Sequence, residues 1–122
     1  EPPAALAAAA PAALDSIFVA SFWTPDDPDP VSRAFVERFR RIAGRDPLPG
    51  DALGYDATMV LAAAVNAVGP DRRAVRDWLA GLGVVRPAHQ GVTGPLRFDV
   101  ERPGPVMMLQ VRGGRVVRVA GW

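Results

Sequence analysis

The sequence predicts an α/β fold in which three successive helices are followed by extended chain and a closing β-hairpin. A β-prone run opens the pattern at residues 17–20, and helical periodicity then continues to Leu82. From Gly94 onward the period changes to that of extended chain. This order lacks the strand–helix alternation of a complete doubly wound domain, so the chain is either part of a larger α/β fold or an α+β arrangement.

The composition fits one globular unit without nucleic-acid or thiol chemistry. Of the 122 residues, 49% are hydrophobic, which is enough to form a core. The 14 basic residues, all of them arginine, balance 13 acidic ones and are scattered along the chain, so nucleic acid is not an expected partner. No cysteine is present, which excludes disulfides, thiol catalysis and cysteine-ligated zinc.

The first residues differ from the rest of the chain. Residues 1–14 are rich in Ala and Pro, and we expect a linker or a frayed helix there. A signal peptide is not expected, because no basic stretch precedes the apolar run and prolines interrupt it. Residues 15–122 are predicted to be the folded portion, and no window in them approaches the roughly 18 apolar residues of a membrane span.

The first helix is predicted at residues 30–43. Before it, a proline- and aspartate-rich loop ends the opening strand. Asp29 and Pro30 are a typical N-cap and first-turn pair, and Gly44 is a typical C-terminal stop. Three large apolar residues recur at i, i+4 and i+7 and are predicted to form a buried stripe: Phe35, Phe39 and Ile42.

The second helix is predicted to start at an Asp51 N-cap and to end near Val68. It is apolar on nearly all sides, and its strongly polar members are Asp56, Thr58 and Asn66. A helix of this kind must be covered on nearly all sides. We therefore expect a larger protein around it that buries Val60, Leu61 and Val65.

A third helix is predicted after Gly69-Pro70, with Asp71 as its N-cap. Its buried stripe is predicted to comprise Val75, Trp78, Leu79 and Leu82. Extended segments are predicted at residues 96–99, 106–112 and 115–119. Gly113-Gly114 joins the last two as a two-residue hairpin turn, which requires positive φ and therefore suits glycine.

Several short motifs follow one another in an order typical of one protein family. They are Gly44-Arg45-Asp46-Pro47, Gly54-Tyr55-Asp56-Ala57, Gly91-Val92-Thr93-Gly94 and Phe98-Asp99. Their order and spacing, more than any single motif, resemble the C-terminal portion of a type I periplasmic binding protein of the branched-chain amino acid receptor family. Two departures from the family pattern are the turn at residues 100–105 and Phe39, where tyrosine is commoner.

The resemblance implies two flavodoxin-like α/β lobes joined by crossing strands, with an amino acid or similar small polar ligand held between them. The ligand would close the lobes by binding the closed form more tightly. The implied function is that of the solute-binding component of an ABC importer, without catalysis. The implied location is periplasmic or extracytoplasmic, with lipid anchoring as a further option.

The implied partners are the ligand, the remainder of the binding protein and an ABC permease. An isolated fragment with exposed sheet edges is expected to form a homodimer or a swapped assembly. The rival interpretation is a ligand-free cell-envelope regulator with the same fold, similar to penicillin-binding-protein activators.

Four residues are candidate ligand contacts. Tyr55 lies near the N-terminal end of its helix, where ring, hydroxyl and helix dipole suit a ligand carboxylate, although it could equally be a core tyrosine. Asp56 could hold an ammonium group or stabilise its own first helical turn. Phe22 and Trp23 end the first strand, where binding groups gather in open α/β sheets, or they pack within the lobe.

No metal, cofactor or catalytic site is predicted. Three acidic residues superficially resemble a calcium loop, but prolines separate them and the required glycine and distal glutamate are missing: Asp26, Asp27 and Asp29. No serine lies in a Gly-x-Ser-x-Gly turn that could work with His89. We therefore expect a binding protein and not an enzyme.

Overall fold

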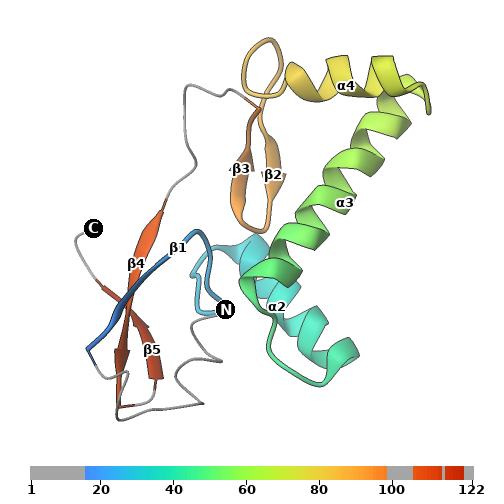
Figure 1. Cartoon of the computed structure of the whole chain (residues 1–122). Helices are drawn as coiled ribbons and strands as arrows, with labels where there is room; N and C mark the ends of the chain where they lie inside the picture. Colours follow the sequence, from blue (N-terminus) through green and yellow to red (C-terminus); the bar gives the residue numbers. More distant parts are fainter. Residues whose placement is uncertain (1–15, 99–105, 114, 120–122) are drawn as a thin grey trace. The chain divides into compact units, whose positions relative to one another are not determined.

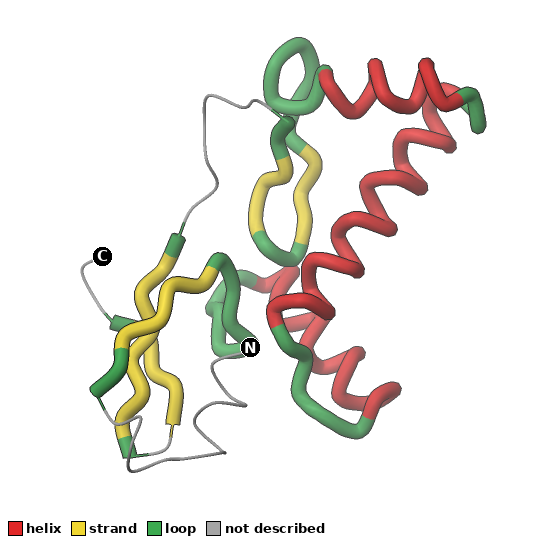
Figure 2. The backbone as a smooth tube through the Cα atoms, viewed as in Figure 1, coloured by secondary structure: helices red, strands yellow, loops and turns green. Residues whose placement is uncertain are grey.

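The computed structural model describes residues 16–98, 106–113 and 115–119. The predicted N-terminal linker at 1–14 and the turn at 100–105 lie outside these residues. The chain divides into two compact units, one formed by Glu1–Thr24 with Pro105–Trp122 and the other by Pro25–Gly104. The described helices, drawn in red in Figure 2, lie within the residue range of the second unit.

The first unit contains a three-stranded antiparallel sheet with the order β1-β4-β5. Its strands are β1 (Phe18–Ser21), β4 (Met107–Arg112) and β5 (Arg115–Arg118). Arg112 pairs with Arg115, so the predicted hairpin with its two-residue turn is confirmed. Gly113, the first turn residue, has a φ of 55°, in the region that favours glycine. Leu109 and Val111 of the central strand are buried.

Helix α2 spans Pro30–Ala43, as predicted. The Asp29 carboxylate accepts hydrogen bonds from the first-turn N–H groups of Val31 and Ser32, and Gly44 ends the helix in the left-handed conformation. Phe35 is buried, but Ile42 is 77% exposed. The predicted apolar stripe is therefore wrong at its last position, because no described element covers the final turn.

Helix α3 spans Pro49–Val68 and starts earlier than predicted. Pro49 occupies the first turn, where a missing N–H costs nothing. Asp51 is not the N-cap but lies in the first turn. Its carboxylate reaches back to accept the N–H of Leu48 at 2.7 Å and a paired hydrogen bond from the Arg45 guanidinium at 2.8 and 3.0 Å.

We expect the hydrogen bonds that Asp51 accepts from Arg45 and Leu48 to make a pH-dependent contribution to the free energy of unfolding. The hydrogen bond from Arg45, and then that from Leu48, lowers the pKa of Asp51. A lowered folded-state pKa means that the stabilisation is present above the ordinary carboxyl pKa and is lost as the pH falls through the folded value. We expect Asp51→Asn to cost about 1 kcal/mol at pH 7, and this difference to shrink below about pH 4.

Urea unfolding of the wild type and of Asp51→Asn at neutral and acidic pH measures this difference. Asp77→Asn is the matched control, because Asp77 is an exposed acid that pairs with its exposed sequence neighbour Arg76. A cost that is the same at both pH values would contradict the prediction.

Helix α3 is covered along one face only. The buried positions recur every four residues, at Ala52, Asp56, Val60 and Ala64. The β2–β3 hairpin lies along this side, and α4 bends back from the C-terminal end of α3 above the hairpin (Figure 1). On the other side Leu61 is 48% and Val65 41% exposed. The prediction that the helix is covered nearly all round is therefore wrong for the described residues, because they supply a covering layer on one side only.

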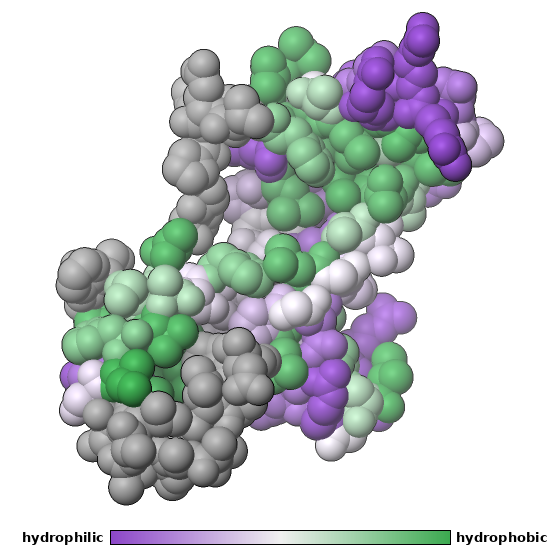
Figure 3. All heavy atoms as spheres, in the orientation of Figure 1, coloured by the Kyte–Doolittle hydropathy of each residue, from purple (hydrophilic) through white to green (hydrophobic). Residues whose placement is uncertain are grey.

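Helix α4 spans Arg72–Ala80, and its N-cap Asp71 accepts the N–H of Ala74, as predicted. Of its predicted apolar stripe, Leu82 is buried, and the other three residues are only half-buried: Val75, Trp78 and Leu79. The loop after α4 exposes Val84 and Val85, and hydrophobic atoms are visible at this end of the molecule in Figure 3.

A second hairpin, which the sequence did not predict, precedes the closing one. It pairs β2 (His89–Gly91) with β3 (Gly94–Leu96) in antiparallel register. Gly91 pairs with Gly94, so Val92 and Thr93 form the turn. The extended segment predicted at 96–99 is therefore wrong in its bounds, because the strand ends at Leu96 and the next two residues are not in a strand, while Asp99 lies outside the described residues. The hairpin was missed because Val and Thr are not typical turn residues.

No helix among the described residues is by itself long and apolar enough to cross a membrane. Helices α3 and α4 reach that length and composition only as a pair, across a bend of 114°.

Candidate functional site

The side chain of Asp56 binds the turn of the β2–β3 hairpin. It is 2% exposed and points from the covered face of α3. One carboxylate oxygen accepts the N–H of Val92 at 2.7 Å, and the other accepts the N–H and the hydroxyl of Thr93 at 2.9 and 2.7 Å. Three donors thus compensate the burial of one carboxylate, and Asp56 joins α3 to a turn that lies 36 residues further along the chain.

Gly91 allows this close approach. A Cβ atom at position 91 would lie 2.6 Å from one carboxylate oxygen of Asp56 and 2.9 Å from the other. Any larger residue would displace either the carboxylate or the hairpin. The Gly-Tyr-Asp-Ala and Gly-Val-Thr-Gly motifs are therefore two halves of one contact, through Asp56 and the residues from Gly91 to Thr93.

Tyr55 lines a hollow on the surface of the second unit. The hollow measures about 410 Å³ and is formed by α2, α3 and the β2–β3 turn. The Tyr55 ring is 38% exposed, and its centroid lies 5.0 Å from that of Phe35. The residues that line the hollow are Pro30, Val31, Ala34, Phe35, Arg38, Tyr55 and Val92. We call it the Tyr55 hollow. Its size and mainly apolar lining suit a small ligand.

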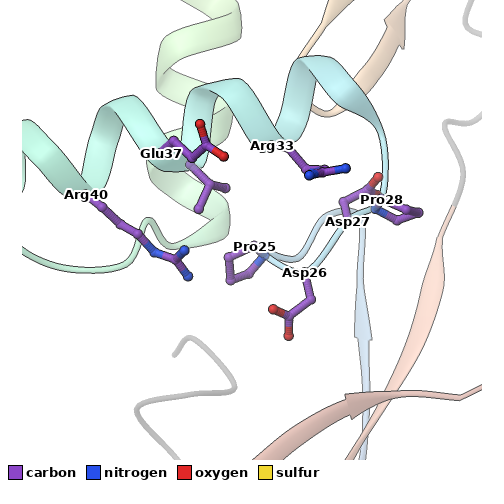
Figure 4. A pocket seen from close by; sticks show the side chains of 8 residues that line it. Pro25, Asp26, Asp27, Pro28, Arg33, Glu37 and Arg40 are labelled. Carbon is purple, nitrogen blue, oxygen red and sulfur yellow. The ribbon is translucent and has the colours of Figure 1, made fainter.

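A different face of α2 borders a second hollow of about 400 Å³, in which charged residues of both signs meet. Arg33 and Arg40 extend from α2 toward the loop of residues 25–28, whereas the Asp26 carboxylate points away from the helix (Figure 4). Arg40 is paired with Asp46, and this hydrogen bond raises the pKa of its guanidinium. The charged side chains face solvent, and this hollow offers a ligand little apolar surface.

Phe22 and Trp23 belong to the first unit, at the end of β1. Trp23 is 1% exposed, and its carbonyl accepts a hydrogen bond from the Ser21 hydroxyl at 2.8 Å. Phe22 is half-buried. In this structure the Trp23 indole offers almost no surface to a ligand. The ligand roles of both residues stay predictions.

The four predicted contacts are thus distributed over different surroundings. Tyr55 lines a hollow, while its neighbour Asp56 points to the hairpin turn with both carboxylate oxygens engaged. Sequence reasoning missed Phe35, Arg38 and Val92 as lining residues. A signal for the first two was available, because Val31, Ala34, Phe35 and Arg38 fall at i, i+3, i+4 and i+7 on one helical face.

Among the described residues, no three acidic or histidine side chains gather in a way that could hold a metal ion. Two of the three aspartates that superficially resemble a calcium loop have local roles instead. Asp29 caps α2, and Asp27 accepts the N–H of Asp29 at 2.9 Å.

Comparison with known proteins identifies the family. Residues 2–116 match the family model described as periplasmic binding protein. No curated protein matches the chain.

Solved structures with the same fold include a leucine binding protein from Thermotoga maritima. It has a TM-score of 0.81 and 25% identity, over 98% of this chain and 34% of its own length. An ABC transporter substrate-binding protein from Desulfitobacterium hafniense, in complex with Leu, has a TM-score of 0.69 and 29% identity, over 87% of this chain and 32% of its own.

A solute binding protein of an ABC transporter from R. palustris, in complex with benzoate, has a TM-score of 0.76 over 93% of this chain and 32% of its own. At 24% identity it supports the fold alone. The chain thus spans about a third of the structures it matches, with 34% coverage at most among these three. From the family match and this shared architecture, the chain belongs to the periplasmic binding protein family and has the type I α/β fold of its branched-chain amino acid receptors.

Proposed function

We propose that this chain forms part of the extracytoplasmic solute-binding component of an ABC importer. The ligand is an amino acid or a similarly small solute, and the protein performs no catalysis. The family match over residues 2–116 carries this proposal. The leucine-bound relative at 29% identity supports the ligand class.

Tyr55 is the proposed ligand contact within this chain. Its ring is partly exposed, packs against Phe35 and lines a hollow of suitable size. The hydroxyl has no hydrogen-bond partner among the described residues, so it is available to a polar group of the ligand. Asp56 is not included among the proposed contacts, because three donors of the hairpin turn already occupy its carboxylate.

The remainder of a binding protein is the proposed partner of the exposed face of α3. Three apolar side chains on this face are each at least 39% exposed: Leu61, Val65 and Val68. A stripe of this kind along a helix is normally covered. The proposal accounts for it, because the structures that the chain matches are about three times its length. An ABC permease is the proposed membrane partner of the assembled receptor.

Isothermal titration of the full-length gene product against a panel of amino acids tests the proposal. We expect one or more apolar amino acids to bind. Tyr55→Ala should weaken that binding about 10- to 100-fold, because truncating a ring at the centre of a contact typically costs more than 1 kcal/mol. Tyr55→Phe should weaken it by about tenfold or less, because only the hydroxyl is lost.

Phe98→Ala is the matched control, since Phe98 is a half-exposed aromatic residue that does not line the Tyr55 hollow. Absence of binding across the panel would favour a ligand-free envelope regulator with the same fold. An unchanged affinity in Tyr55→Ala would remove Tyr55 from the site and leave the proposed class of protein intact.

A further inference from the structure

Arg38 is the charged residue of the Tyr55 hollow. The other six lining residues are aliphatic, aromatic or proline, and no acidic side chain is among them. Arg38 follows Val31, Ala34 and Phe35 on the same face of α2. The aliphatic part of its side chain therefore continues the apolar wall of the hollow, and the guanidinium group lies at the end of this side chain.

Arg38 has no carboxylate partner among the described residues, and unlike Arg33 and Arg41, which also have none there, it lines the Tyr55 hollow. Arg40 pairs with Asp46, and Arg45 pairs with Asp51. Arg38 makes no such pair in the described part of the chain. A guanidinium presents five donors in a planar fork that fits a carboxylate with two parallel hydrogen bonds. An anion from outside the chain is its natural complement.

The other lining residues of the hollow determine which kind of molecule can carry the anionic group. The rings of Tyr55 and Phe35 lie 5.0 Å apart at an interplanar angle of 48°, which favours an apolar body. The wall opposite α2 is held in place, because Asp56 binds the backbone N–H of Val92 at 2.7 Å. A volume of about 410 Å³ admits a small molecule, not a peptide.

We propose that the Tyr55 hollow binds a small monocarboxylate with an apolar body, with the carboxylate paired to Arg38. Since none of the described residues that line the hollow is acidic, they offer the ligand's amino group no favourable contact. The ligand class is therefore an apolar carboxylate, for which an amine is not required. This inference rests on the proposed solute-binding function and narrows its ligand.

The test uses three probes of similar shape on the full-length gene product: isocaproate, its neutral amide and L-leucine. By isothermal titration we expect isocaproate to bind about 10- to 100-fold more tightly than the amide. L-leucine should bind no more tightly than isocaproate. Arg38→Gln should weaken the binding of isocaproate to about that of the amide and so remove the preference for the carboxylate, and Arg38→Lys should retain part of that preference.

Arg41→Gln is the matched control, because it makes the same change on the same helix at a position that does not line the hollow. Thermal unfolding of each variant checks that the fold is retained. The inference is overturned if Arg38→Gln binds isocaproate as the wild type does, or if the amide binds as tightly as the acid. It is also overturned if L-leucine binds much more tightly than isocaproate, although the proposed solute-binding function then stands. If neither these probes nor any amino acid binds, both proposals fail.

Discussion

Replacing Asp56 by alanine is expected to lower the free energy of unfolding by about 3 kcal/mol, which is one of the two largest effects predicted for this chain. The substitution leaves two backbone N–H groups and one hydroxyl without their acceptor, in a place where the carboxylate was 2% exposed. Hydrogen bonds to a charged group contribute about 1.5–3 kcal/mol each, and water entering beside the half-buried Thr93 recovers part of the loss. Thermal unfolding followed by circular dichroism measures the change.

Two further variants make the interpretation specific. Asp56→Asn keeps one acceptor oxygen but turns an NH₂ group toward the donors, so it should cost about as much as the alanine variant or slightly less. Thr93→Val keeps the shape of Thr93 and removes only its hydroxyl, so it should cost about 1 kcal/mol. A change within 0.5 kcal/mol for Asp56→Ala, as expected of an exposed acid such as Asp77, would show that the hairpin turn does not depend on this carboxylate.

Asp56 also shows where the sequence was informative and where it was not. Local signals placed α2 correctly, because its N-cap, first-turn proline and C-terminal glycine all act within a few residues. The partner of Asp56 lies 36 residues away, and no local signal reports such a contact. Local signals therefore predict a ligand contact or a dipole partner for this acid, and they do not reveal that its carboxylate binds a distant turn.

The difference between local signals and long-range contacts also explains why the sequence does not predict the β2–β3 hairpin. Two-residue hairpin turns usually contain Asn or Gly, and these residues allow the turn to be predicted from sequence. Here the turn residues are Val92 and Thr93. Their backbone N–H groups are bound by Asp56, so part of the turn's stability comes from another element. Turn propensity could not reveal it. The Gly-Val-Thr-Gly spacing was recognised only as a family motif, without its structural role.

The sequence shows that α3 is apolar on more than one face, but it predicts correctly the burial of only one of these faces. Residues four apart from Ala52 to Ala64 are buried, as an apolar helix requires. Leu61 and Val65, on another face, remain exposed in the described chain. The spacing of apolar residues along a helix indicates which faces are apolar, but it does not indicate which part of the protein covers each face. The chain spans about a third of the relatives it matches, and we propose that the remainder of a binding protein covers this face.

Replacing Gly91 by alanine is the second prediction with a large effect, and it tests the Asp56 contact from the opposite side. The new Cβ would lie 2.6–2.9 Å from the Asp56 carboxylate atoms, so either the carboxylate rotates away from its donors or the hairpin shifts. We expect a cost of about 2–3 kcal/mol, typical of overpacking at a tight site. The control is Gly54→Ala, where no atom lies within 4 Å of the added Cβ. Because alanine favours a helix, that variant should gain about 0.5–1 kcal/mol.

The double variant Gly91→Ala/Asp56→Ala distinguishes a direct clash from a general effect on the backbone. Once the carboxylate is removed, the methyl group at position 91 has room, and its additional cost should fall below about 0.5 kcal/mol. The coupling free energy between the two positions is then about 2 kcal/mol, measured by urea unfolding of the wild type, the two single variants and the double variant. Additive costs would mean that alanine at 91 disturbs the strand itself, and the close approach of Gly91 to Asp56 would no longer explain why glycine occupies this position.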